Sequence, residues 1–134
     1  MPIIEELRGL GFCPGLTYVH KGGRFDVRHG EASQVPSPLV YVIVDRHGES
    51  VKVGRSLRQN IIQRRGSVTA MNGLNGVSTV GQNSKPVVVN LRREILQSGP
   101  LVVYVRHCKT VDEARDQEKA LFDRFRGRID KRRG

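Results

Sequence analysis

The chain has 134 residues, with 23 Lys and Arg against 13 Asp and Glu, so its formal net charge is +10. This length suits one domain with a buried core, and a hydrophobic share of 37% is typical of a globular protein rather than a disordered one. Such a basic protein is expected to meet a polyanion. Nucleic acid is the default partner, although a generically basic protein would carry the same excess.

The sequence does not favour a membrane or secreted protein. No apolar run approaches the ~20 residues that a spanning helix requires, so no membrane partner is expected. The first ten residues include Glu5, Glu6 and Arg8, where a signal peptide would have its apolar region. We therefore expect a cytoplasmic protein. Its two cysteines, Cys13 and Cys108, form no framework and no zinc-ligand spacing, and are expected to be free thiols.

Residues 1–37 are interpreted as an N-terminal extension joined to the rest by a linker, with a role that the sequence leaves open. A short helix is expected over residues 2–10. Residues 16–19 and 24–27 predict two short strands, because the segment Lys21-Gly22-Gly23 between them is typical of a turn.

Two runs rich in β-branched residues follow, residues 38–44 and 51–56, and they flank a polar segment that contains Gly48. This pattern predicts a β-hairpin. Each run carries one residue that a plain core strand would not choose, Tyr41 in the first and Lys52 in the second. Whether these two side chains meet depends on the hairpin loop.

A two-residue loop at His47-Gly48 would place Val44 opposite Val51 and Ile43 opposite Lys52. The tyrosine would then lie diagonally from the lysine on the same face of the sheet. A bulge or an odd-length loop would separate them.

A basic helix is expected next, over residues 57–65, with Ser56 as its cap. Arg64 is expected beside the apolar face of this helix, and Arg65 competes for the same place. Residues 67–85 are rich in Gly, Asn, Ser and Thr, and predict either a functional loop or a mobile one.

The next helix is expected to begin at Pro86 and to end at Gly99, although the valines at 87–89 also permit a short strand. Residues 101–105 predict a buried strand beside the hairpin. The apolar face of the helix is formed by Val88, Leu91 and Ile95.

The last helix is the clearest element of the sequence. Thr110 and Glu113 form a capping box, and Glu118 falls on the apolar face of the helix. A carboxylate there is costly unless it is paired or binds a cation. The chain ends in a basic tail, residues 127–134. The apolar face itself comprises Val111, Ala114, Leu121, Phe122 and Phe125.

Together these pieces resemble the GIY-YIG nuclease superfamily. The first half of its signature, a strand ending in tyrosine, is matched by Leu39-Val40-Tyr41, and the second half by Lys52-Val53-Gly54. A helix with a glutamate four residues after an alanine is matched by Ala114 and Glu118. The resemblance covers residues 38–126 and implies an α+β fold, in which helices flank a small, central, mostly antiparallel sheet.

The chain departs from the family pattern at two places. Lys52 replaces the second signature tyrosine, which is similar to a phage-associated branch whose second motif reads Lys-Ile-Gly followed by a small hydroxyl residue. The asparagine that many members carry near their end is not evident after Phe125. The resemblance thus implies a phage-related nuclease of a prokaryotic or phage-infected cell.

The implied function is metal-dependent endonuclease hydrolysis of DNA, with double-stranded DNA as the partner. Tyr41 would take the proton from water, helped by the charge of Lys52, which favours the phenolate. Arg64 would grip the scissile phosphate, and Glu118 would bind one Mg²⁺ or Mn²⁺. Gly54 is also interpretable as a close-packing glycine. DNA contacts are expected from Gly54, Arg55, Arg65, Arg92, Arg93, Arg126, Lys131 and Arg132.

Each proposed catalytic residue also has a structural interpretation. Tyr41 can be an amphipathic core residue, and Lys52 can extend from a half-solvated strand. Glu118 can form a salt bridge to Arg64 or Arg115. For the whole chain, the alternatives are a catalytically inactive GIY-YIG-like DNA-binding module and a basic RNA-binding or ribosome-associated protein.

Overall fold

The computed structural model describes residues 2–30, 35, 38–56 and 86–130. In this part of the chain, three helices flank a five-stranded sheet of order β2-β1-β5-β3-β4, in which every neighbouring pair is antiparallel. The predicted α+β class and antiparallel sheet are confirmed. No described helix is long and apolar enough to cross a membrane. The elements are α1 (Ile4–Gly9), β1 (Cys13–Lys21), β2 (Arg24–His29), β3 (Leu39–Val44), β4 (Ser50–Ser56), α4 (Pro86–Ser98), β5 (Leu101–His107) and α5 (Val111–Phe125).

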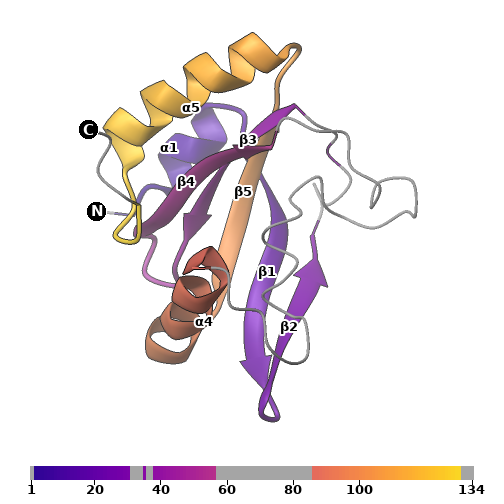
Figure 1. Ribbon diagram of the computed structural model, residues 1–134, viewed down its shortest axis with the longest axis vertical. Helices are drawn as coiled ribbons and strands as arrows, with labels where there is room; N and C mark the ends of the chain where they lie inside the picture. The colour runs from indigo at the N-terminus through magenta and orange to yellow at the C-terminus, as the bar shows by residue number, and fades with distance from the viewer. Residues whose placement is uncertain (1, 31–34, 36–37, 57–85, 131–134) are drawn as a thin grey trace.

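Helices cover both faces of the sheet, with α4 on one face and α1 and α5 on the other (Figure 1). All six residues of β3 are buried, as expected for a strand covered on both sides. Successive residues of a strand point to opposite faces, so β3 supplies two cores. Tyr41 and Ile43 contribute to the core under α4, whereas Val40 and Val42 contribute to the core under α5.

The N-terminal helix and both N-terminal strands occur where the sequence predicts them. Gly22 and Gly23 have φ values of 60° and 75°, which a tight hairpin turn between β1 and β2 requires. β1 also pairs with β5, with Leu16 opposite Val103. One sheet therefore contains strands from both sides of residue 38, the boundary expected between the N-terminal extension and the main domain.

The β3–β4 hairpin has part of the expected register but not the expected loop. Ile43 lies opposite Lys52 as predicted, but Val44 pairs with Ser50 rather than Val51, because a bulge interrupts the register between Ile43 and Val44. The predicted two-residue loop is wrong: the loop spans residues 45–49 and has an odd length. The bulge and the odd length offset one another, so Tyr41 and Lys52 still share a face.

Asp45 explains why the loop is longer than predicted. Its Oδ1 accepts hydrogen bonds from the backbone N–H groups of His47, at 2.8 Å, and Glu49, at 3.0 Å. Its own N–H donates to the carbonyl oxygen of Glu49 at 2.9 Å. An aspartate that bonds backbone groups two and four residues later closes such a turn locally.

α4 begins and ends where the sequence predicts, and the alternative strand at its start does not form. Leu91 and Ile95 are buried, as expected. Gly99 has a φ of 85°, and its N–H donates to the carbonyl oxygen of Ile95 at 2.9 Å, which ends the helix. The side chain of Val88 lies outside the described part of the helix.

α5 has the predicted cap, since Thr110 Oγ1 accepts the N–H of Glu113 at 3.0 Å. Glu113 Oε2 accepts the N–H of Lys109 at 3.2 Å, one residue before the N–H that a complete capping box would use. Val111 is 37% exposed, so its predicted place on the buried face is wrong. The buried residues of α5 are Ala114, Glu118, Leu121, Phe122 and Phe125.

Several predictions fall outside the described residues. These are the helix of residues 57–65 with Arg64 and Arg65, the loop of residues 67–85, and two residues of the basic tail, Lys131 and Arg132.

Candidate functional site

The edge strand β4 carries two basic residues on opposite faces of the sheet. Lys52 lies opposite Ile43 on the face under α4, and Arg55 lies on the face under α5. Each pairs with a carboxylate from the C-terminal part of the chain. Lys52 Nζ lies 3.5 Å from Asp130 Oδ1, and Arg55 Nη1 lies 2.6 Å from Glu118 Oε1. The edge strand therefore carries two ion pairs, one on each face of the sheet.

Asp130 is a site residue that the sequence reading missed. Its side chain is 3% exposed, and its Oδ2 accepts the N–H groups of Val53, at 2.9 Å, and Gly127, at 2.8 Å. A Cβ at Gly127 would lie 2.1 Å from the Val51 carbonyl, so only glycine permits this close approach. The one available signal was that Asp130 is an isolated acid in a basic tail.

Glu118 is 7% exposed on α5, beside apolar neighbours, as its place in the helical pattern predicts. A buried carboxylate requires a partner. Arg55 is such a partner among the described residues, although the sequence had suggested Arg64 or Arg115. Arg64 lies outside the described residues. Arg55 itself was expected to contact DNA, but in this structure its guanidinium is engaged by the carboxylate.

Tyr41 is 8% exposed, and its ring leans across Gly54, the residue opposite it on β4. A Cβ at Gly54 would lie 2.3 Å from both Cζ and Oη of the tyrosine. The glycine thus provides the space that the ring fills. Gly54 is buried beneath this ring, which corresponds to its close-packing interpretation and not to an exposed DNA contact.

The pKa of Tyr41 is raised, first by burial and then by the nearby carboxylates of Asp130 and Glu118. The sequence reading expected the opposite direction, from the charge of Lys52. That expectation is wrong for this arrangement, because Asp130 pairs with the lysine and itself opposes the phenolate. At neutral pH, Tyr41 is therefore a neutral phenol that can donate a hydrogen bond.

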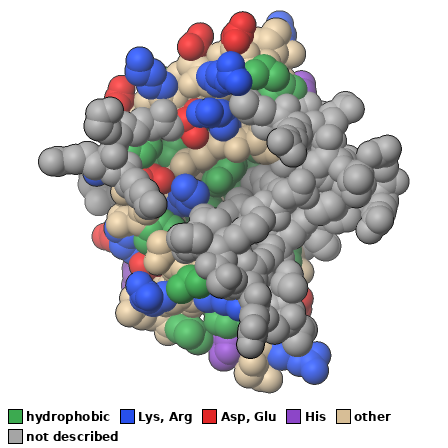
Figure 2. All heavy atoms as spheres, in the orientation of Figure 1, with side chains coloured by type: hydrophobic (Ala, Val, Ile, Leu, Met, Phe, Trp, Pro, Cys, Tyr) green, Lys and Arg blue, Asp and Glu red, His purple; other side chains and the backbone are tan. Residues whose placement is uncertain are grey.

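The other expected DNA contacts are dispersed. The Arg92 guanidinium lies 5.1 Å from the centre of the Phe25 ring, and that of Arg126 lies 5.5 Å from the Phe122 ring. Arg93 is exposed on α4. In Figure 2 the Lys and Arg side chains of the described residues are spread over the visible face rather than gathered in one patch. The described basic side chains alone therefore do not locate a binding site.

The acidic residues limit the metal site that the chain can form. Among residues 2–30, 35, 38–56 and 86–130, no group of three or more His, Cys, Asp or Glu side chains could enclose a metal ion. Mg²⁺ often binds through only one or two carboxylates and retains several waters. A site built on Glu118 would therefore be of this open kind and not a closed protein cage.

Comparisons with protein-family models, with curated proteins and with solved structures found no significant match to this chain.

Proposed function

We propose that the chain is a metal-dependent endonuclease that hydrolyses DNA phosphodiester bonds. One observation carries the proposal: two buried carboxylates, Asp130 and Glu118, pair with the edge strand that carries Lys52, near Tyr41, whose pKa is raised first by burial and then by these carboxylates. Residues whose pKa values are perturbed by burial together with nearby charges are enriched at active sites. The resemblance to GIY-YIG nucleases selects the same tyrosine, lysine and glutamate.

Each residue has a role in this proposal that its surroundings support. Glu118 would hold one Mg²⁺ or Mn²⁺, which when bound supplies positive charge to the phosphate oxygens and activates water. Lys52, partly exposed and paired with Asp130, contributes positive charge near the phosphate. Tyr41 donates a hydrogen bond from its neutral hydroxyl. Asp130 follows Phe125 in the chain, in the region where the family pattern leads one to expect an asparagine.

Plasmid nicking tests this proposal. The parent protein is incubated with supercoiled DNA and Mg²⁺ or Mn²⁺, alongside Glu118→Gln and Lys52→Ala. The control is Asp116→Asn, which removes an exposed carboxylate from the same helix. We expect cleavage by the parent and the control, and a loss of about 100-fold or more in Glu118→Gln, as for removal of a major electrostatic group. If the parent protein did not cleave DNA with any common divalent ion, the proposed endonuclease activity would be wrong.

A DNA-binding module without catalysis is the second candidate, and two observations favour it. Glu118 is already paired with Arg55 at 2.6 Å, and Tyr41 has a raised pKa, which disfavours a role as a base. Such a module would bind DNA with an affinity that falls steeply with salt and depends little on sequence. It would leave supercoiled plasmid intact under every condition of the nicking assay.

A further inference from the structure

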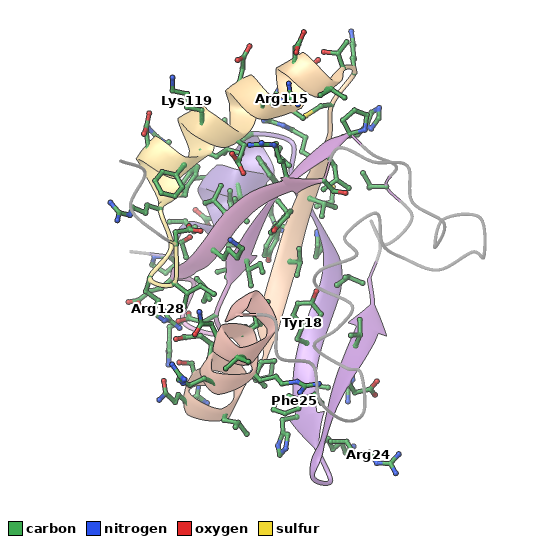
Figure 3. The ribbon with its side chains drawn as sticks, viewed as in Figure 1. Tyr18, Arg24, Phe25, Arg115, Lys119 and Arg128 are labelled. Atoms are coloured by element: carbon green, nitrogen blue, oxygen red, sulfur yellow. The ribbon has the colours of Figure 1, made fainter. Side chains whose placement is uncertain are left out.

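Arg128 lies in the C-terminal turn, defined here as residues 126–130, and it is surrounded by three carboxylates. Its Nη1 lies 2.8 Å from Asp45 Oδ2 and 3.7 Å from Glu49 Oε2, and its Nε lies 2.6 Å from Glu94 Oε1. Asp45 and Glu49 belong to the β3–β4 loop, and Glu94 belongs to α4. Figure 3 shows Arg128 below the end of α5, on the side of the molecule where α4 lies.

The C-terminal turn also bonds along the backbone of β4. The N–H of Arg128 donates to the carbonyl oxygen of Ser50 at 3.4 Å, and that of Ile129 donates to the carbonyl oxygen of Val51 at 3.1 Å. Asp130 comes next and accepts the N–H of Val53 at 2.9 Å. The arginine is thus fixed two residues before the aspartate that pairs with the site lysine.

We propose that Arg128 is a positioning residue, which anchors the C-terminal turn to Asp45 and Glu94 and thereby holds Asp130 against Lys52. The effect on DNA cleavage rests on the proposed function, whereas the effect on the position of Asp130 does not. The sequence predicts only a basic tail for residues 127–134, and this arginine acquires its role from the three-dimensional arrangement.

Burial and charge explain why an arginine is needed here. The side chains of Asp45 and Glu94 are 2% and 11% exposed, so leaving both without a cation would place two charges in a poorly solvated region. The planar guanidinium can meet both carboxylates at once, since Nη1 faces one and Nε faces the other. A lysine provides only a point charge and cannot reproduce this geometry.

Amide hydrogen exchange in Arg128→Ala and Arg128→Lys tests the inference. The reporters are the Val53 and Gly127 N–H groups, both of which donate to Asp130, and the reference is the set of amides in the β1–β5 pairing. The control is Arg124→Ala, which removes one positive charge and one exposed ion pair, to Glu6, from the end of α5. The carboxyl ¹³C resonance of Asp130 provides a second readout of its position.

We expect reporter protection, relative to the reference amides, to fall roughly 10- to 100-fold in Arg128→Ala, as for the loss of hydrogen bonds to charged groups, and the Asp130 resonance to shift. Arg128→Lys should restore part of the protection, and Arg124→Ala should match the parent. If Arg128→Ala does not fold, Glu94→Gln provides a milder loss of the same anchor. Unchanged reporter protection in Arg128→Ala and in Glu94→Gln would overturn the inference.

Cleavage separates this inference from the proposed function. If the parent cuts DNA, Arg128→Ala should lower kcat with little change in KM, because the arginine acts through Asp130. If the parent does not cut DNA but the reporter amides lose protection in Arg128→Ala, the proposed endonuclease function is wrong and the positioning role of Arg128 is supported. If the parent cuts DNA and the reporters are unaffected, the positioning role is wrong.

Discussion

The ring of Tyr41 occupies the space that a side chain at Gly54 would take, since a Cβ there would lie 2.3 Å from the phenol oxygen. Replacing Gly54 by alanine must displace the ring or the edge strand. We expect Gly54→Ala to lower the free energy of unfolding by about 1–3 kcal/mol, the usual cost of overpacking, when urea denaturation is followed by circular dichroism.

The same relationship provides its own control. In a Tyr41→Ala background the ring is absent, so Gly54→Ala should become nearly neutral, and the two changes should show a coupling free energy of about 1 kcal/mol or more. Gly9→Ala serves as a matched glycine, because a Cβ there meets no atom within 4 Å. Equal penalties for Gly54→Ala in both backgrounds would contradict this packing relationship.

Tyr41 should resist ionisation at alkaline pH. Its folded-state pKa is raised by burial and by Asp130 and Glu118, and burial also raises the pKa of Tyr18, with a further contribution from Tyr41. A raised tyrosine pKa stabilises the fold below the unfolded pKa of about 10, and this contribution is lost as the pH rises from there towards the folded-state value.

Ultraviolet absorbance of the phenolate measures this behaviour directly. In a pH titration of the folded protein, we expect a fraction of the tyrosine signal to appear only when the protein unfolds. Tyr41→Phe should reduce that fraction and weaken the loss of stability above about pH 10. If a phenolate signal appeared below about pH 10 in the folded protein and was absent in Tyr41→Phe, the pKa of Tyr41 would not be raised, and this prediction would be wrong.

The anchor around Asp45 predicts acid sensitivity. Burial alone would raise the pKa of this carboxyl, but hydrogen bonds from the Glu49 N–H, Arg128 and the His47 N–H outweigh burial and lower it. A depressed pKa stabilises the fold above the unfolded value of about 3.9, and this stability is lost as the pH falls from there through the folded-state pKa.

Asp45→Asn should therefore reduce the stability at neutral pH and flatten its decline below about pH 4. Urea denaturation of parent and variant between neutral and acidic pH measures both effects. Parallel pH dependences in the two proteins would show that this carboxyl does not contribute to acid unfolding.

DNA binding, with or without cleavage, should depend on salt. The net charge of +10 predicts an affinity that falls linearly on logarithmic axes as salt rises. If Arg93 and Arg126 contact phosphates, Arg93→Gln and Arg126→Gln should each reduce the slope by about one unit. Arg8→Gln, an exposed change on α1, controls for net charge. Fluorescence anisotropy with a labelled duplex provides the measurement, and equal slopes in all variants would exclude both contacts.

Patterned segments could be predicted from the sequence, whereas contacts made by the chain end could not. Helical spacing located Glu118 on a buried face. The pairing of Ile43 with Lys52 was predicted from a two-residue loop that does not form, and it occurs because a bulge offsets the odd loop. The loop was misjudged because Asp45 bonds backbone groups, a contact that hydrophobic periodicity does not encode. Asp130 accepts the backbone N–H groups of Val53 and Gly127, and contacts of this kind leave no residue pattern in the sequence.

The C-terminal turn has a further consequence for the behaviour of the protein at high concentration. An exposed edge strand offers its backbone N–H and C=O groups to strands of other molecules, which is a common origin of aggregation. Here Ile129 and Asp130 occupy the backbone groups of Val51 and Val53 on β4. The C-terminal turn therefore also blocks edge-to-edge pairing of β4 with other molecules. Shortening the chain to Phe125 would lower the solubility of the protein and would remove Asp130 from the site.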